Sequence, residues 1–215
     1  METFTIDDAR AMFDGIAEMF DRHCEKLCEM DAMMGDGDLG LTMKKGFAVC
    51  AETIWQSQDT NPGKAIMMAG MKMSSAVPST MGTLMSSGLM TGGKAVADQC
   101  EWGPAEFAAF LDGFCAGVAK RGKCAPGDRT IYDALSAASE RAGQAQRAGR
   151  NLDEVSKAAW EGALEGVERT KQMMPKFGKA AVFSEKAIGN ADQGAVAAGL
   201  LMEAMYRSIH SKCET

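Results

Sequence analysis

The sequence has 215 residues, of which 46% are hydrophobic and 24% are charged. This balance is typical of a folded globular chain and excludes a disordered or fibrous protein. The formal net charge is −6, so the chain lacks the general attraction to phosphate backbones that nucleic-acid-binding proteins exploit. We expect one domain over residues 1–215 and no nucleic-acid partner.

Targeting signals are absent from the N-terminal segment METFTIDDAR, which carries acidic residues and no apolar leader. No later stretch of eighteen residues is free of charged and polar groups, as a membrane-spanning helix requires. The seven cysteines form an odd set spread over the chain, whereas a disulfide framework would be even and denser. We expect a cytoplasmic protein without a membrane partner, whose thiols are reduced and mostly buried.

Apolar residues recur at intervals of three and four along most of the chain, and strand-like clusters of β-branched residues are almost absent. The pattern predicts eight amphipathic helices. Their expected ranges are about 6–30, 41–57, 62–76, 82–98, from 104 to the loop at 121–129, from 131 onward, 152–174 and 192–212. The short links between them favour antiparallel neighbours, so we expect an all-α closed barrel or bundle of eight antiparallel helices.

Several helix boundaries carry recognisable signals. Capping boxes are predicted where Ser, Thr or Asn is followed three residues later by an acid, and prolines favour the first helical turn. The predicted caps are Thr5 with Asp8, Thr130 with Asp133 and Asn151 with Glu154, and the prolines are Pro62 and Pro104. The third helix should stop before Val77, because Pro78 disfavours a helical conformation in the preceding residue.

The densest polar chemistry lies in residues 31–40, DAMMGDGDLG, between the first two predicted helices. The carboxylates of Asp31, Asp36 and Asp38 repel one another unless a cation neutralises them. Oxygen ligands suit a hard divalent cation, and the spacing does not follow a calcium-binding EF-hand. Because magnesium usually shares its coordination with substrate phosphates, a nucleotide would be the natural ligand. A Gly-rich turn that binds nothing explains the same segment equally well.

A second candidate segment is PSTMGT at 78–83, directly ahead of the fourth predicted helix. Its hydroxyls, its glycine and the exposed amides of a helix N-terminus suit a phosphate group. Other kinds of catalytic site have little support. His23 and His210 are the only histidines, so a Ser-His-Asp triad or a Cys-His pair would have almost no residue to act as its base. A Walker A loop is also absent, so any nucleotide site must be of another design.

Four blocks of sequence together resemble the nucleotide-binding L subunit of bacterial dihydroxyacetone kinases, which is also the C-terminal domain of single-chain versions. The blocks are MGDGDLGLTMKKGF (34–47), STMGTL (79–84), RGKCAPGDRTIYDAL (121–135) and GKAAVFSEKAIGNADQGA (178–195). The resemblance covers nearly the whole chain. It implies a closed barrel of eight antiparallel helices with the nucleotide at one rim, which agrees with the helix pattern.

The resemblance also implies a set of binding residues. Two magnesium ions that bridge the phosphates of ADP or ATP would be held by Asp31, Asp36 and Asp38. The positions that match the family's nucleotide contacts are Leu39, Gly40, Leu41, Thr42, Thr80, Met81, Gly122, Ile131, Lys179, Asp192, Gln193 and Gly194. Those from Leu39 to Met81 would lie against the phosphates, Gly122 and Ile131 would flank the adenine, Lys179 would be a basic neighbour of the phosphates, and 192–194 would close the site.

Three departures from the family pattern stand in these blocks. Many family members have histidine where Leu39 stands, a Ser-Gly-Pro run where Met81-Gly82-Thr83 stands, and arginine where Lys179 stands. Lysine keeps the charge of arginine but not its bidentate grip on phosphate. We expect the details of the nucleotide contacts to differ from those of the family.

The resemblance implies a phosphotransferase subunit that is incomplete alone. The family phosphorylates a small ketose that a separate K subunit holds, so no catalytic side chain is expected here, and the metal site would support phosphoryl transfer. The nucleotide would be ATP, or a bound ADP that a phosphotransferase-system protein rephosphorylates. A kinase subunit for a related ketose such as erythrulose and a non-catalytic, nucleotide-bound regulatory partner remain alternatives.

Overall fold

Helices make up most of the computed structural model, which describes residues 3–177, 181 and 187–213. Within these residues the only β pairing is an isolated bridge between Phe4 and Trp102. The helices are α1 (Ile6–Arg22), α2 (Cys24–Ala32), α3 (Leu39–Gln56), α4 (Pro62–Ala76), α5 (Thr80–Ala95), α6 (Pro104–Gly122), α7 (Ile131–Arg147), α8 (Leu152–Thr170) and α10 (Gln193–Cys213).

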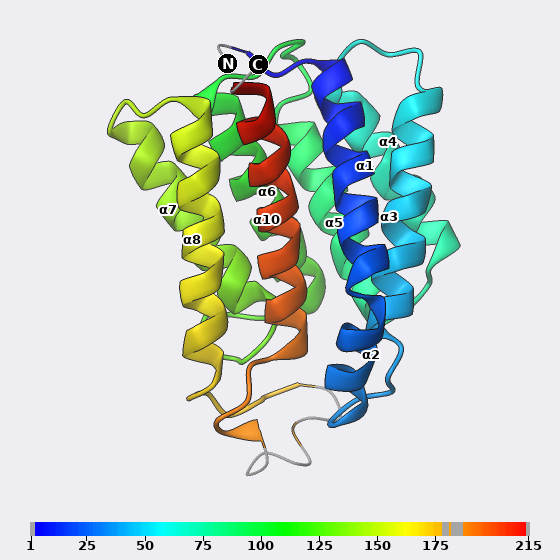
Figure 1. Ribbon diagram of the computed structural model, residues 1–215, viewed down its shortest axis with the longest axis vertical. Helices are drawn as coiled ribbons and strands as arrows, with labels where there is room; N and C mark the ends of the chain where they lie inside the picture. The colour runs from blue at the N-terminus through cyan, green and yellow to red at the C-terminus, as the bar shows by residue number, and fades with distance from the viewer. Residues whose placement is uncertain (1–2, 178–180, 182–186, 214–215) are drawn as a thin grey trace.

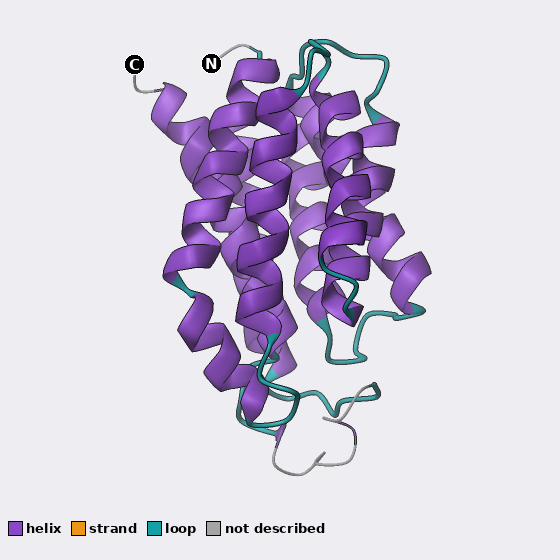
Figure 2. Cartoon of the chain, turned by 90° about the vertical axis from the view of Figure 1, so that its right-hand side faces the viewer, coloured by secondary structure: helices purple, strands orange, loops and turns teal. Residues whose placement is uncertain are grey.

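The long helices form a closed ring. Each of α1, α3, α4, α5, α6, α7, α8 and α10 packs against the next in this order, and α10 closes the ring on α1. Successive helices run up and down, so the loops gather at the two ends (Figures 1 and 2). Both termini lie at the upper end in Figure 1, while α2 and the segment that leads into α10 lie at the lower end. The expected all-α closed barrel of antiparallel helices is confirmed.

The first predicted helix, expected over about 6–30, is in fact two helices. The break falls at His23, whose φ of −102° and ψ of 9° are not helical. The start of α3 passes close by, because a Cβ on Gly40 would lie 1.9 Å from the carbonyl oxygen of Cys24. No proline or glycine marks the break in the sequence, so the helical period alone predicted one continuous helix.

Most capping signals act as predicted. Asp8 accepts a hydrogen bond from the backbone N–H of Thr5 at 2.7 Å, and capping boxes are present at the starts of α7 and α8. The third predicted helix ends at Ala76, as expected from Pro78. Bounds were wrong in three further helices. α3 begins at Leu39 instead of near 41, and α8 ends at Thr170 instead of near 174. α5 runs from Thr80 to Ala95 instead of about 82–98, and its start is set by the Ser79 hydroxyl, which accepts the Gly82 N–H at 3.0 Å.

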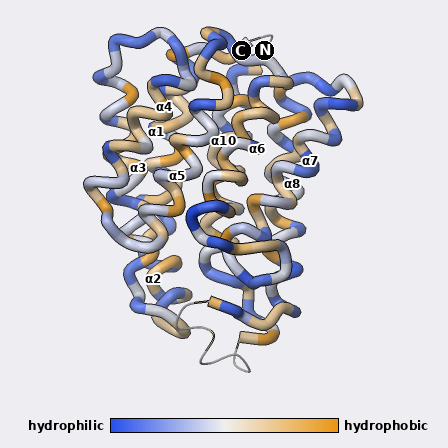
Figure 3. The backbone as a smooth tube through the Cα atoms, turned by 180° about the vertical axis from the view of Figure 1, so that it is seen from behind, coloured by the Kyte–Doolittle hydropathy of each residue, from blue (hydrophilic) through white to orange (hydrophobic). Residues whose placement is uncertain are grey.

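The helices share one hydrophobic core, to which every long helix contributes buried side chains. Apolar and polar positions alternate along the tube in Figure 3, in agreement with amphipathic helices around this core. Glycine allows the closest contacts: a Cβ on Gly88 of α5 would lie 2.8 Å from the Phe114 ring of α6. None of the described helices combines the length and the apolar character needed to cross a membrane.

The cysteines are free thiols, as expected. They are less buried than predicted, since only Cys24, Cys50 and Cys115 are buried and Cys100 is exposed. Burial raises the pKa of Cys50 and of Cys115 to about 12. These two thiols therefore behave as small apolar side chains.

Candidate functional site

A cavity of about 880 Å³ opens at the lower end of the ring, between loops from four parts of the chain. It collects most of the residues predicted as a binding site. Those that line it are Asp31, Asp36, Asp38, Leu39, Thr80, Met81, Gly122, Ile131, Asp192, Gln193 and Gly194. Segments from the two ends of the sequence thus meet at this end of the ring.

Three predicted contacts do not line this cavity. The side chain of Leu41 is 60% exposed on α3, and Gly40 is buried against Cys24 of α2. The Thr42 hydroxyl is buried and lies 3.4 Å from the Ser79 hydroxyl, so it supports the cap of α5. A fourth predicted residue, Lys179, lies outside the residues that the structure describes.

The acidic loop is folded around the side chain of Asp31, near the end of α2. Asp31 Oδ2 accepts hydrogen bonds from the backbone N–H of Gly37 at 2.8 Å and of Asp38 at 3.1 Å. Gly37 has a φ of +76°, a conformation that favours glycine. The turn therefore needs both the Asp31 carboxylate and this glycine, while Asp36 and Asp38 are left exposed at its tip.

The three aspartates face one cavity without forming a ready-made metal cluster. Among the described residues, no three His, Cys, Asp or Glu side chains are grouped closely enough to hold a metal ion. Asp31 is partly engaged by the loop amides, whereas Asp36 and Asp38 are exposed. The donor set is all oxygen and lines an open pocket, so it suits a hard cation that completes its shell with water and phosphate.

The start of α5 forms the facing wall. Thr80 and Met81 lie in its first helical turn, where amide N–H groups have no partner within the helix. A Cβ on Gly82 would lie 2.1 Å from the Val77 carbonyl oxygen, so the chain can turn tightly into the helix only with glycine there. The helix dipole and these amides make this wall favourable for an anion.

The start of α10 closes the third side. Asp192 caps this helix, since its Oδ1 accepts the Ala195 N–H at 2.8 Å. The backbone N–H of Asp192 donates to the Thr170 hydroxyl at 2.9 Å. The next residue, Gln193, donates from Nε2 to Asp31 Oδ1 at 3.2 Å. The start of α10 is thereby joined directly to the acidic loop.

Burial dominates the electrostatics of Asp192. It raises the pKa of this carboxyl to about 6, although the Ala195 N–H and the Arg129 guanidinium act in the opposite direction. Asp133, which has like charge, adds to the rise. Protonation of Asp192 is therefore expected just below neutral pH.

Arg129 is a site residue that the sequence did not single out. It lines the cavity, and its side chain is fully buried. It lies within the block RGKCAPGDRTIYDAL, directly before the cap of α7. The only available signal was that position, since charge alone does not distinguish a buried arginine from a solvated one.

The loop that carries Arg129 is held by two carboxylates, Asp128 within the loop and Asp133 in the first turn of α7. Asp133 accepts from the backbone N–H groups of Gly127 at 2.5 Å and Thr130 at 2.7 Å. Asp128 accepts from the Ala125 N–H at 2.8 Å and forms an ion pair with Lys176. That ion pair lowers the pKa of Asp128, so the loop stays tied down at neutral pH.

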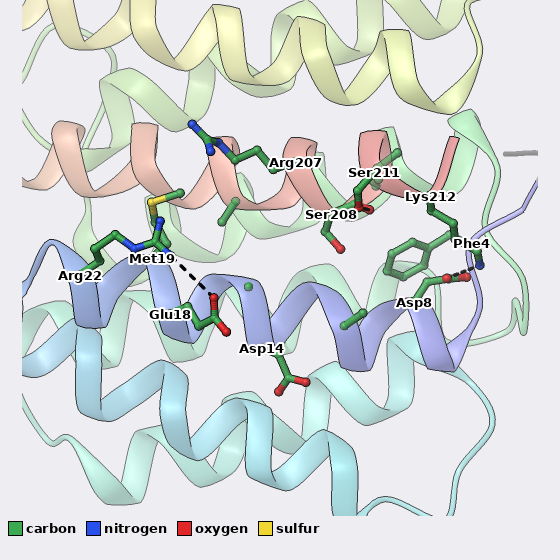
Figure 4. A pocket seen from close by; sticks show the side chains of 14 residues that line it. Phe4, Asp8, Asp14, Glu18, Met19, Arg22, Arg207, Ser208, Ser211 and Lys212 are labelled. Atoms are coloured by element: carbon green, nitrogen blue, oxygen red, sulfur yellow. Dashed lines mark hydrogen bonds and ion pairs between the residues drawn. The ribbon is translucent and has the colours of Figure 1, made fainter. Parts of the chain in front are cut away.

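A second cavity, of about 740 Å³, lies between α1 and α10, and none of the predicted site residues lines it. The charges along it are largely paired: Lys212 contacts Asp8, and Arg22 lies 3.8 Å from Glu18 (Figure 4). It shows no concentration of acceptors or donors of one kind. The lower cavity is therefore the candidate functional site.

Comparison with known proteins identifies the family of the chain. The model of the DAK2 domain matches residues 33–207. The chain belongs to the DAK2 domain family. The match includes the acidic loop after Ala32, the α6–α7 loop and the start of α10, so the expected relationship is confirmed, while the residue-by-residue assignments remain predictions.

Individual relatives differ in length. The L-erythrulose kinase of Pectobacterium atrosepticum is 27% identical over 86% of this chain but only 32% of its own length. The ADP-binding subunit DhaL of the PEP-dependent dihydroxyacetone kinase of Escherichia coli is 28% identical over 86% of this chain and 89% of its own length. The chain thus spans about a third of the erythrulose kinases it matches and most of the DhaL subunits.

The fold recurs in the dihydroxyacetone kinase of C. freundii. Its native crystal structure superposes with a TM-score of 0.72 at 23% identity, over 93% of this chain and 34% of that one. The complex of the same kinase with AMP-PNP and Mg²⁺ gives the same TM-score at 24% identity. At these identities the likeness establishes the fold.

Proposed function

We propose that this chain is the magnesium-nucleotide-binding subunit of a dihydroxyacetone-type kinase. The observation that carries the proposal is the lower cavity, where the acidic loop, the start of α5 and the start of α10 meet. Carboxylates on one wall and helix N-terminal amides on the other match the two needs of a metal-bound polyphosphate. Relatives named for ADP binding and a neighbour crystallised with AMP-PNP and Mg²⁺ support this choice of ligand.

In this proposal each wall has one task. Asp31, Asp36 and Asp38 would hold two Mg²⁺ ions, and these ions would offset the negative charge on the phosphoryl group during transfer. The amides at the start of α5 would bind phosphate oxygens, and Gly122 with Ile131 would leave room for the adenine. Lys179 would add a positive charge near the phosphates. No side chain of the described chain is needed as an acid or base, since positioning supplies most of the rate in phosphoryl transfer.

The acceptor would be held by another protein. The relatives that this chain spans almost completely are named as subunits of a PEP-dependent dihydroxyacetone kinase. We therefore propose that a separate K subunit presents dihydroxyacetone, and that the phosphoryl group comes from ATP or, through bound ADP, from a phosphotransferase-system donor.

Erythrulose is the second candidate substrate. Three relatives, each about three times as long as this chain, are named L- or D-erythrulose kinases. Because the sugar would be bound by the K subunit, this chain would serve either ketose with the same cavity. An assay with purified K subunit, offering dihydroxyacetone and both erythrulose enantiomers with ATP or phosphotransferase donors, distinguishes these substrates.

Calorimetry tests the binding site itself. We expect the wild-type chain to bind Mg-ADP and Mg-ATP, and Asp36→Ala to weaken both by more than about tenfold, since loss of even an outer partner of a metal ligand costs about 10- to 100-fold. Asp98→Ala is the matched control, because this exposed residue follows α5 outside the cavity. Equal affinities for Asp36→Ala and the wild type would rule out the proposed metal site.

A further inference from the structure

Arg129 is charged and buried, and its backbone conformation is unfavourable. Its side chain has no exposed surface, and its φ of 58° is in the left-handed region, where residues other than glycine are uncommon. Burial of a guanidinium is costly unless acceptors surround it. A residue with both features persists only where its neighbours hold it firmly, and such residues cluster at functional sites.

The partners of Arg129 within the described chain come from one segment, 187–192, which leads into α10. Its Nη2 donates to the carbonyl oxygens of Ala187 at 3.2 Å and Asn190 at 3.0 Å. Its Nη1 lies 3.8 Å from Asp192 Oδ2. One side chain thus ties the start of α7 to a segment about 60 residues later in the chain, and that segment carries one wall of the cavity.

Two nitrogen atoms of this guanidinium, Nε and Nη1, are buried and have no hydrogen-bond acceptor among the described residues. Leaving such groups unpaired is rare in folded proteins. The Nη1 distance to Asp192 lies just beyond hydrogen-bonding range, so a shift of about 1 Å at Asp192 would complete a charge-assisted bond. The contact between Arg129 and Asp192 can therefore become considerably stronger than it is in this conformation.

The same segment continues into the acidic loop. Asp192 is followed by Gln193, which donates to Asp31 at 3.2 Å. Arg129, Asp192, Gln193 and Asp31 thus lie along a single path from the start of α7 to the carboxylates of the proposed metal site. Arg129 itself is too deeply buried to be the group that meets solvent-borne phosphate first.

We propose that Arg129 is a positioning residue of the nucleotide site, which sets the distance between the start of α10 and the acidic loop by holding segment 187–192. This inference rests on the proposed function. Arg129 acts through Asp192 and Gln193, and its contact with Asp192 tightens when nucleotide occupies the cavity. The planar fork of arginine is needed, because a lysine ammonium cannot reach both carbonyl groups and the carboxylate from the same position.

Nucleotide affinity in a small set of variants tests the role. Arg129→Met should weaken Mg-ADP binding about tenfold to a hundredfold, the range expected when hydrogen bonds to a charged group are lost. Arg129→Lys keeps the charge and should fall between that variant and the wild type. Arg141→Met is the matched control on the nearby helix α7, because Arg141 pairs with Glu165 on the exposed surface at 2.7 Å; its affinity should be unchanged.

A double-mutant cycle with Asp192→Asn separates positioning from general stability. If Arg129 acts through Asp192, the combined variant should lose less affinity than the product of the two single losses. A combined loss of affinity equal to the product of the two single losses would overturn the proposal. Wild-type affinity in folded Arg129→Met would overturn it as well. Should Arg129→Met fail to fold, Arg129→Lys decides: an affinity within about twofold of the wild type overturns the proposal, and a larger loss supports it.

Hydrogen exchange measured without ligand tests the positioning role of Arg129 independently of the proposed function. The backbone N–H groups of Asp192, Ala195 and Val196 are hydrogen-bonded around the start of α10, and they should exchange faster in Arg129→Met but not in Arg141→Met. Failure of the wild-type chain to bind any magnesium-nucleotide contradicts the proposed function and leaves this exchange result standing. Unchanged exchange at all three amides overturns the positioning role of Arg129.

Discussion

The two ends of the helical ring contain different kinds of side chain. At the upper end, Trp102 stacks between Phe4 and Phe110, with ring centroids 5.3 Å apart on both sides. The backbones of Phe4 and Trp102 also exchange two hydrogen bonds, at 2.7 and 2.8 Å. At the lower end, carboxylates, a buried arginine and helix starts surround a cavity of about 880 Å³.

This difference indicates that the upper end contributes mainly to the free energy of unfolding and the lower end mainly to ligand binding. Stacked, fully buried aromatic rings gain free energy from area removed from water, and Phe4, Trp102 and Phe110 expose almost no surface to a ligand. The lower end places carboxylates and helix N-terminal amides around an open cavity, and it buries the charged side chain of Arg129, which is costly for stability. Changes at the upper end should therefore alter the free energy of unfolding without altering nucleotide affinity, and the reverse should hold for the tip of the acidic loop.

The largest effect is expected from Phe110→Ala at the upper end. Phe110 is fully buried, and removal of a buried phenylalanine ring costs about 3–5 kcal/mol of unfolding free energy. Urea unfolding measures this cost, and calorimetry on the folded variant should give wild-type affinity for Mg-ADP. Weakened binding by the folded variant would show that the two ends are coupled.

The next effect is expected from Gly40→Ala, where packing and binding should change together. The added Cβ would meet the Cys24 carbonyl oxygen at 1.9 Å, so α2 and α3 must separate, at a cost of about 1–3 kcal/mol. Because Asp31 lies in the last turn of α2, nucleotide affinity should fall as well.

Gly15→Ala provides the control for this change. Nothing lies within 4 Å of a Cβ at Gly15 of α1, so alanine should stabilise that helix by about 0.5–1 kcal/mol. Thermal unfolding of both variants measures the difference. Equal melting temperatures would contradict the close packing of α2 on α3.

A smaller effect concerns pH. Burial raises the pKa of Asp192 to about 6 in the folded chain, from an ordinary value of 3.8, so the folded state keeps a proton that the unfolded state has lost between these values. The stabilisation from this group is complete below the unfolded pKa and is lost as pH rises through about 6. Relative to Asp192→Asn, the wild type should lose roughly 1–3 kcal/mol between pH 4 and pH 7. Urea unfolding at the two pH values measures this, and a pH-independent difference would argue against the buried carboxyl with its raised pKa.

The smallest effect on stability is expected from Asp38→Asn. Asp38 is exposed, and its side chain makes no cap bond to α3, so the unfolding free energy should change by less than about 0.5 kcal/mol. Mg-ADP affinity should nevertheless fall by more than about tenfold. A variant that loses stability and keeps affinity would reverse the proposed division between the two ends.

Much of the ring could be predicted from the sequence, because helix period and capping are local properties. Thr130 with Asp133 and Asn151 with Glu154 marked helix starts that the structure confirms. The break at His23 could not be predicted, since its surroundings come from the packing of Gly40 against Cys24, which are distant in sequence. The missed bound at α5 has a local cause, because Ser79 was available as a cap.

The residues that line the cavity could be predicted better than the contacts that each of them makes. The resemblance grouped Asp31, Thr80 and Asp192 in one binding site, and all three line the same cavity. It did not reveal that Gly40 serves helix packing or that Arg129 is buried beneath the cavity. Burial of this charge depends on the start of α7 meeting segment 187–192, which no local pattern records.

The most direct test of a magnesium-dependent nucleotide site is calorimetry of ADP binding to the wild-type chain with and without Mg²⁺. The three aspartates line one cavity, and their like charges favour a cation between them and the phosphates. We predict measurable affinity with Mg²⁺ and a loss of more than about tenfold when EDTA removes it. Equal affinity in both conditions, or no binding in either, would contradict a magnesium-dependent nucleotide site in this cavity.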